Sequence, residues 1–295
     1  MSKKLADAIT KGPLLFSLAM LISGSIGLFV RLIELSPINI VFFRCTFGAL
    51  TLGLYVFLFR RSSIRILRSD LVPILCCGFV LVANWIFLFA AFKQTSITVA
   101  VSIYYLAPVL VTLYGLFFLS QKGTKPIILG ILLAFFGAAL VSGITIEDLL
   151  SLNILGASYA FLAAVFYAAL ILLSKNVKRT DSALTSFVQT AVGALVLSFF
   201  ADFDIAFAEL NWGLVIAIGA VHTALLYILF FRGIRDSPIF LVALLGFIDP
   251  LFAIFLDRFV LGSEISSVQL AGIICIVAAL TLKALSENKT EQLIE

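Results

Sequence analysis

Ten long apolar runs constrain the fold of this chain more than any other feature of its sequence. Each holds about 18 to 24 residues, and a helix needs about 20 residues to cross the hydrocarbon core of a bilayer. Of the 295 residues 62% are hydrophobic and 12% charged, which leaves little sequence for a soluble domain. The sequence therefore predicts an all-α integral membrane protein in a lipid bilayer. The runs cover residues 13–31, 37–59, 70–91, 95–119, 126–143, 154–174, 183–200, 212–231, 237–257 and 267–285.

Basic residues predict the orientation of these helices. If both termini lie on one side, that side holds all of the 20 basic residues except Arg31, Arg44, Lys93 and Arg258. Cytoplasmic segments carry an excess of Lys and Arg, so we expect both termini in the cytoplasm of a bacterial-type inner membrane. The first run, 13–31, is too long for a signal peptide and is expected to stay as a helix. The net charge of +4 follows from this topology and does not indicate nucleic-acid binding.

The two halves of the chain resemble each other. FFRCTFGALTLGL at 42–54 aligns with FVQTAVGALVLSF at 187–199, and YYLAPVL at 104–110 aligns with GFIDPLF at 246–252, which places Pro108 opposite Pro250. Five helices per half is an odd number, so the second half must run through the membrane in the opposite sense. The sequence predicts two inverted five-helix repeats, residues 1–145 and 146–295, an architecture typical of secondary transporters.

Several function classes lack any sequence support. No GxxxxGK[ST] nucleotide-binding loop is present, so ATP does not drive a reaction of this chain. Ser102, His222 and Asp249 have no spacing that would assemble a catalytic set, and the four cysteines have no spacing that predicts a metal site. We therefore expect no enzyme activity, no cofactor and no metal, and a small-molecule solute as the partner.

Several motifs together resemble one family of transporters. They are SPINIVFFR at 36–44, FKQTSITVAVSIYYLAPVL at 92–110, SPIFLVALLGFIDPL at 237–251 and LGSEISSVQLAG at 261–272. Over essentially its whole length the chain is similar to the EamA-type transporters of the drug/metabolite transporter superfamily. The resemblance implies a ten-helix basket whose cavity is lined mainly by helices one, three, four, six, eight and nine. It also implies efflux of a metabolite, an amino acid or a related compound.

Two other functions stay open at this point. The same scaffold could import a nutrient or a nucleotide-linked solute, which a cluster of cations in the cavity would favour. The protein could instead be a non-transporting membrane subunit, which long soluble tails or docking loops would favour. If the protein is a secondary transporter, protons are a candidate coupling ion.

Asp249 is the residue whose presence most needs an explanation. It lies inside an apolar run, where a charged side chain costs about 2.5–3.5 kcal/mol on insertion scales. Asp before Pro250 could cap a restarted helix. The repeat counterpart, Ala107 before Pro108, offers a similar helix break without a carboxylate. Asp249 is therefore a candidate solute contact or proton carrier, with capping or ion pairing as the alternative.

Arg44 is the second charged residue inside an apolar run. Counted from the outer ends of their runs, Arg44 and Asp249 lie at similar depth, about 10 to 12 Å at helical rise, which permits a salt bridge. Snorkelling toward the membrane surface and a structural contact between helices are the alternatives.

The remaining candidates are polar or aromatic residues on helices that the resemblance places at the cavity. His222, the only histidine, could relay protons or could be an interhelical hydrogen-bond partner. Gly24, Ser25 and Gly27 are expected to permit close approach or hinge movement of the first helix. Aromatic rings with a few amide and hydroxyl groups suit a partly apolar solute or a cation, and packing is the alternative. This last group comprises Asn84, Trp85, Tyr104, Tyr105 and Tyr227.

Overall fold

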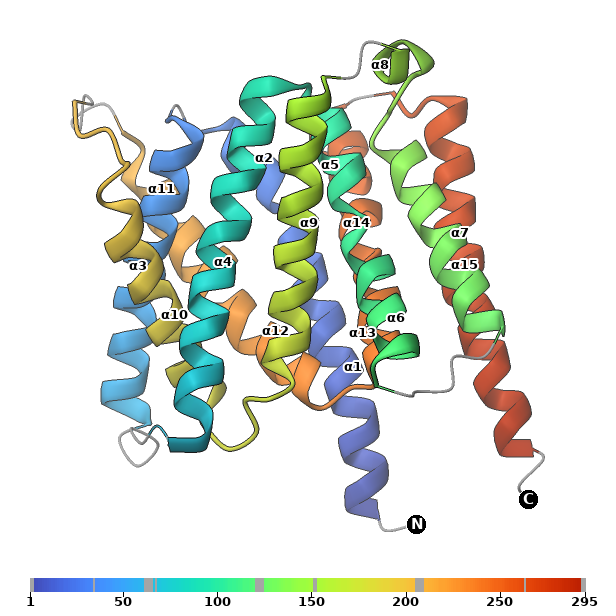
Figure 1. Ribbon diagram of the computed structural model, residues 1–295, viewed down its shortest axis with the longest axis horizontal. Coiled ribbons are helices and arrows are strands. Elements are labelled where there is room, and N and C mark those ends of the chain that lie inside the picture. The colour runs from blue at the N-terminus through green and yellow to red at the C-terminus, as the bar shows by residue number, and fades with distance from the viewer. Residues whose placement is uncertain are drawn as a thin grey trace.

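The computed structural model is a bundle of helices that cross repeatedly from one end of the molecule to the other (Figure 1). It describes residues 3–33, 35–60, 66, 68–119, 125–150, 153–204, 210–262 and 264–292. Within these ranges seven helical passes are long and apolar enough to span a membrane, and three more apolar helices are shorter. The shorter ones are Lys125–Val141, Ser182–Leu197 and Ser267–Leu282. Together they confirm the predicted all-α membrane fold.

Both termini lie at one end of the bundle, here termed the terminal end, and the short helix α8 lies at the opposite, distal end (Figure 1). The α-helices are α1 (Lys3–Gly24), α2 (Ile26–Arg31), α3 (Pro37–Phe59), α4 (Arg68–Gln94), α5 (Ile97–Tyr104), α6 (Ala107–Phe117), α7 (Lys125–Val141), α8 (Ile146–Leu150), α9 (Ile154–Ser174), α10 (Ser182–Leu197), α11 (Trp212–Gly219), α12 (Leu226–Arg235), α13 (Ile239–Leu245), α14 (Ile248–Phe259) and α15 (Ser267–Gln292). A π-helical segment, Ala220–Leu225, joins α11 to α12 within one pass.

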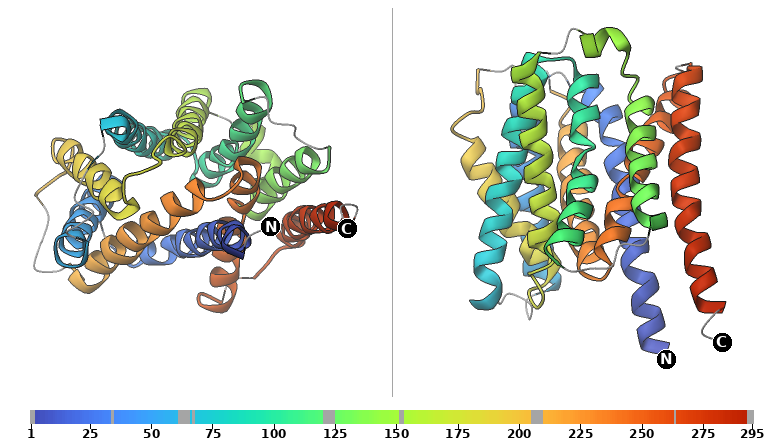
Figure 2. Two further views of the ribbon diagram at one scale, coloured as in Figure 1. Left: turned by 90° about the horizontal axis from the view of Figure 1, so that it is seen from below. Right: turned by 45° about the vertical axis from the view of Figure 1, so that its right-hand side comes forward.

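The most extensive contacts between helices join the first half of the chain to the second. They are α4 with α9, α7 with α15, α3 with α10 and α1 with α12. In the repeat, pass three corresponds to pass eight and pass six corresponds to pass one. The contact of α4 with α9, passes three and six, is therefore equivalent to the contact of α12 with α1, passes eight and one. The other two pairs map onto themselves, and Figure 2 shows α7 and α15 side by side. This pairing supports the inverted repeat, while the boundary between residues 145 and 146 stays a prediction.

Four of the passes are interrupted along their length. The first breaks at Ser25, between α1 and α2, and the eighth contains the π-helical segment. The fourth breaks between α5 and α6 and the ninth between α13 and α14. Pro108 and Pro250 lie in the first turns of α6 and α14, where the missing N–H of proline is tolerated. The two breaks face each other, because a Cβ added at Gly246 would lie 3.7 Å from the Pro108 ring.

At the terminal end, the link between α9 and α10 is held to its neighbours by hydrogen bonds that are buried or partly buried. The carboxylate of Asp70, in the first turn of α4, accepts hydrogen bonds from the Arg179 amide at 2.9 Å, the Thr180 amide at 2.7 Å and the Thr180 hydroxyl at 2.9 Å. Arg235, the last residue of α12, donates to the Thr180 carbonyl at 3.2 Å. This network joins α4, the link and α12, and it is termed the terminal-end lock.

Lys175 follows α9 directly, and its ammonium group donates a hydrogen bond to the Ser237 carbonyl. Burial lowers the pKa of Lys175 from 10.5 to about 8, against the opposing influence of the Asp236 carboxylate. The folded protein therefore releases this proton at a lower pH than the unfolded chain does. Stability rises with pH wherever the unfolded state binds more protons, so Lys175 contributes a gain in stability between about pH 8 and 10.5.

We expect this gain to be visible as a difference between two melting curves. The melting temperature of the purified protein minus that of the Lys175→Met variant is expected to increase as the pH rises from 8 to 10.5. The difference isolates Lys175 because other titrating groups affect both proteins equally. A constant difference across this range would contradict the buried position of the ammonium group.

Candidate functional site

The break in the first pass lies directly against Asp249. The Ser23 hydroxyl hydrogen-bonds to the Asp249 carboxylate. Gly24, the last residue of α1, lies so close that a Cβ added to it would be 2.5 Å from the Asp249 carbonyl oxygen. Close approach or hinge movement was expected of Gly24, Ser25 and Gly27, and a Cβ at Gly27 would meet nothing within 4 Å. Of the two glycines, only Gly24 brings the first pass against the ninth.

Asp249 is the second residue of α14, so its carboxylate lies at the positive end of that helix. The N-cap position itself is occupied by Phe247, which makes no side-chain cap. Asp249 is half-buried, and the partner of its carboxylate comes from α1 and not from its own helix. The carboxylate therefore joins two passes at the centre of the bundle.

Arg44, on α3, is directed toward the π-helical segment of the eighth pass. Its Nε donates to the Thr223 hydroxyl at 3.3 Å and its Nη2 donates to the His222 carbonyl at 3.1 Å. The guanidinium also lies 5.7 Å from the centre of the Trp85 ring, in a cation–π arrangement. Among the described residues Arg44 forms no ion pair. The salt bridge with Asp249 that their similar depth in the membrane would permit is therefore not formed.

His222 is buried between the first and eighth passes. Its Nε2 lies 2.8 Å from the Ser25 hydroxyl, and its ring packs 4.4 Å from that of Phe29. The Ser25 hydroxyl also lies 2.8 Å from the Ile22 carbonyl oxygen. The buried Nδ1 of His222 has no hydrogen-bond partner among the described residues.

Aromatic side chains fill the space between these charged and polar groups. Trp85 and Tyr227 occupy equivalent positions of the repeat, and their rings lie 6.4 Å apart. Tyr104 stacks on Tyr167 of α9 at 5.2 Å, and its hydroxyl contacts the Asn84 side chain at 3.2 Å and 3.3 Å. Asn84 is buried and also donates to the Ala163 carbonyl at 2.7 Å, a contact that anchors it between α4 and α9.

Tyrosine side chains lie near both charged groups. Tyr104, Tyr105 and Tyr167 lie near the Asp249 carboxylate, and Tyr104 and Tyr227 lie near the Arg44 guanidinium. The structure therefore brings the predicted candidates into one central region, with a carboxylate toward one side, a guanidinium toward the other and aromatic rings between. This arrangement suits recognition of a solute that is partly apolar and carries charge.

Three residues of this region were not candidates from the sequence. Ser23 and Thr223 are small hydroxyl residues that occur throughout apolar helices, and nothing in their sequence context distinguishes them. Tyr167 lies on the sixth helix, which the family resemblance places at the cavity, so an inventory of polar rings on those helices would have found it. Within the described residues, no group of three or more His, Cys, Asp or Glu side chains is placed to hold a metal ion.

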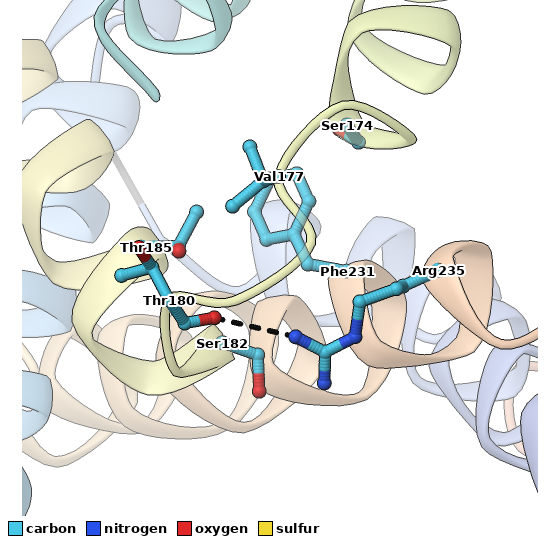
Figure 3. A pocket seen from close by; sticks show the side chains of 7 residues that line it. All are labelled: Ser174, Val177, Thr180, Ser182, Thr185, Phe231 and Arg235. Carbon is cyan, nitrogen blue, oxygen red and sulfur yellow. Dashed lines mark hydrogen bonds between the residues drawn. The ribbon is translucent and has the colours of Figure 1, made fainter. Parts of the chain in front are cut away.

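A small pocket lies elsewhere, at the terminal end (Figure 3). None of the candidate residues lines it. Its lining comes from the end of α9, the link after it, the start of α10 and the end of α12, and comprises Ser174, Val177, Thr180, Ser182, Thr185, Phe231 and Arg235.

A helical membrane bundle made of two inverted halves, with interrupted helices and charged side chains at its centre, defines the class of secondary-transporter folds. The model of the EamA-like transporter family matches this chain over residues 10–143 and again over 154–284. The chain therefore belongs to the EamA-like transporter family, and it is a membrane transporter and not an enzyme.

Individual relatives of this chain are described as transporters as well. An uncharacterized transporter of Bacillus subtilis (strain 168), YxxF, is 37% identical over 286 residues, which cover 95% of this chain and 90% of the relative. An uncharacterized transporter of Archaeoglobus fulgidus is 24% identical over 90% of this chain and 93% of its own length. A solved crystal structure with 17% sequence identity matches the fold with a TM-score of 0.79, over 93% of this chain and 97% of the other.

Proposed function

We propose that this protein is a secondary transporter that moves an amino acid or a related small metabolite by alternating access, with export as the favoured direction. The observation that carries the proposal is the separation of Asp249 from Arg44 within one aromatic region. An amino acid carries an ammonium group and a carboxylate on one small framework. Asp249 complements the first group and Arg44 the second, and the guanidinium has five N–H donors, of which two are engaged in hydrogen bonds.

We further propose a bacterial-type inner membrane as the location, with both termini in the cytoplasm. The predominance of Lys and Arg in segments at the terminal end supports this orientation, and the relative in Bacillus subtilis supports a bacterial setting. In this orientation the terminal end of the bundle is its cytoplasmic end.

Protons are the proposed coupling ion, and Asp249 is their proposed carrier. The Asp249 carboxylate lies at a helix break and contacts the first pass, so its charge can influence how these passes pack. His222 is the weaker candidate, because its protonation would place a second positive charge beside the Arg44 guanidinium, which donates to the His222 carbonyl.

The two alternatives have less support. Recognition of nucleotide phosphates calls for several cations, whereas Arg44 is the only basic residue in the interior of an apolar run. A non-transporting subunit would need surfaces for a partner protein, and the links between the apolar runs are short.

The proposal is tested by thermal unfolding of the purified protein with a panel of solutes at two pH values. The panel holds amino acids, polyamines, nucleosides, nucleotide derivatives and quaternary amines. A solute that binds only the folded state stabilises it by about 2.7 kcal/mol at a hundredfold excess over its dissociation constant. We expect an amino acid to raise the melting temperature in a pH-dependent way. A shift with nucleotide derivatives alone would favour the import alternative, and no shift with any solute would overturn the proposed substrate class.

A further inference from the structure

Two buried polar side chains of α10 have no hydrogen-bond partner among the described residues. Both the nitrogen and the oxygen of the Gln189 carboxamide are unpaired, and so is the Thr185 hydroxyl. Gln189 is fully buried and Thr185 is 2% exposed. Leaving such groups without partners is unfavourable, and buried polar groups are nearly always paired with protein or water. These side chains therefore indicate a need for contacts that the present arrangement of helices does not supply.

Thr185 and Gln189 lie one helical turn apart, and the next turn continues the same face. Thr185 lines the pocket at the terminal end (Figure 3). Gly193, one turn beyond Gln189, faces Trp85, whose ring would lie 3.7 Å from an added Cβ. This face of α10 thus leads from the pocket to the aromatic region that holds Arg44.

The wall opposite Gln189 is formed by α4. A Cβ added at Gly78 would lie 3.6 Å from the Gln189 Cα, so the two helices are in contact at this level. The neighbouring Cys77 is fully buried, and its sulfur lies 3.8 Å from the hydroxyl of Ser174, which lines the pocket. Polar groups of α4, α9 and α10 therefore meet between the pocket and the centre.

The terminal-end lock closes this region toward the cytoplasm. Asp70 of α4 accepts three hydrogen bonds from the link, two of them from Thr180, which lines the pocket. Arg235 of α12 donates to the Thr180 carbonyl (Figure 3). Every bond of the lock joins the link to another pass. Separation of α4 or α12 from the link would therefore open the pocket toward the cytoplasm.

We propose that the region between α4, α9, α10 and α12 is the cytoplasmic half of the solute pathway, closed in this structure, and that Thr185 and Gln189 contact water and solute when it opens. The inference rests on the proposed transport function. Hydroxyl and carboxamide groups offer both donors and acceptors, so the pathway suits a small hydrated solute that is neutral or zwitterionic.

Cys77 provides a test that needs no knowledge of the solute. The four cysteines are free, so Cys45, Cys76 and Cys275 can be replaced by alanine to leave Cys77 alone. The probe is a charged, membrane-impermeant methanethiosulfonate applied to the cytoplasmic face of inside-out vesicles. The Cys77 thiolate attacks the reagent and forms a mixed disulfide as a sulfinate leaves. A protein that retains only Cys275, which lies on α15 beside α7, is the matched control.

We expect Cys77 to react about tenfold or more faster than Cys275, because thiolate formation and a charged reagent both require water. Gln189→Leu removes two unpaired polar groups from the closed form and their water contacts from the open form. It should therefore raise the melting temperature and slow the reaction of Cys77 about tenfold, which corresponds to about 1.4 kcal/mol in the equilibrium between the two forms.

Two outcomes would overturn the inference. One is a Cys77 that reacts no faster than Cys275, and the other is a reaction rate unchanged by Gln189→Leu, which would mean that Gln189 does not line the route. Both readouts are separate from solute binding. A failed solute panel with a reactive Cys77 would reject the proposed substrate and keep the pathway, and the reverse pattern would reject the pathway alone.

Discussion

Asp249→Asn is expected to abolish or uncouple transport while the protein still folds. Asparagine keeps the size of the side chain and its ability to hydrogen-bond with Ser23, but it carries no charge and does not exchange a proton. Loss of one hydrogen bond to a charged group costs about 1.5–3 kcal/mol, which corresponds to roughly a tenfold to hundredfold loss of solute affinity. The melting temperature should stay equal or rise, because a charge inside an apolar run is removed.

The measurement is solute flux in proteoliposomes, with and without an imposed pH gradient, alongside the melting temperature in detergent. Asp204→Asn is the control, because Asp204 is an exposed carboxylate of a link at the distal end. Normal flux that still responds to the pH gradient in Asp249→Asn would return this residue to a purely structural role.

Gly24→Ala is expected to lower both the stability of the protein and its solute flux. The added carbon would lie 2.5 Å from the Asp249 carbonyl oxygen and 3.1 Å from the Phe252 Cβ, so α1 or α14 would have to move. Insertion of carbon atoms into a packed interior typically costs about 1–3 kcal/mol. The displacement should also weaken the hydrogen bond of Ser23 to Asp249, and flux should fall together with the melting temperature.

Gly27→Ala is a closely matched control for this variant. It adds the same methyl group three residues further along the same pass, where nothing lies within 4 Å of the new carbon. Since alanine also favours helix more than glycine does, Gly27→Ala should leave flux intact and leave stability unchanged or slightly higher. Equal behaviour of the two variants in flux and melting temperature would contradict the close contact between α1 and α14.

The fold could be predicted because its determinants are local in the sequence. Apolar runs set the number of passes, and matched motifs revealed the inversion of the two halves. The orientation inferred from the basic residues stays a prediction. Asp249 and Arg44 could be recognised as candidates for a related reason, since a charge inside an apolar run is conspicuous. Their relation could not be predicted, because depth follows from sequence position whereas helix rotation depends on packing. The Arg44 guanidinium is instead directed to the His222 carbonyl.

Other parts of the site have no signature in the sequence. The π-helical segment Ala220–Leu225 changes the hydrogen-bond spacing within the eighth pass without any proline or glycine inside it. Ser23 acquires its significance only through a neighbour that is distant in the chain. The unpaired carboxamide of Gln189 is likewise a property of the packed helices, because a sequence does not show which polar groups lack partners.

The crosswise pairing of helices also bears on how the chain is made. During synthesis the first five passes enter the membrane before their principal neighbours exist. The first half then holds an Arg44 without the His222 carbonyl and Thr223 hydroxyl, and an Asn84 without the Ala163 carbonyl. These polar groups lack their partners, in the bilayer or beside the insertion machinery, until the second half has been synthesised. These interior hydrogen bonds can therefore form only once both halves are in the membrane.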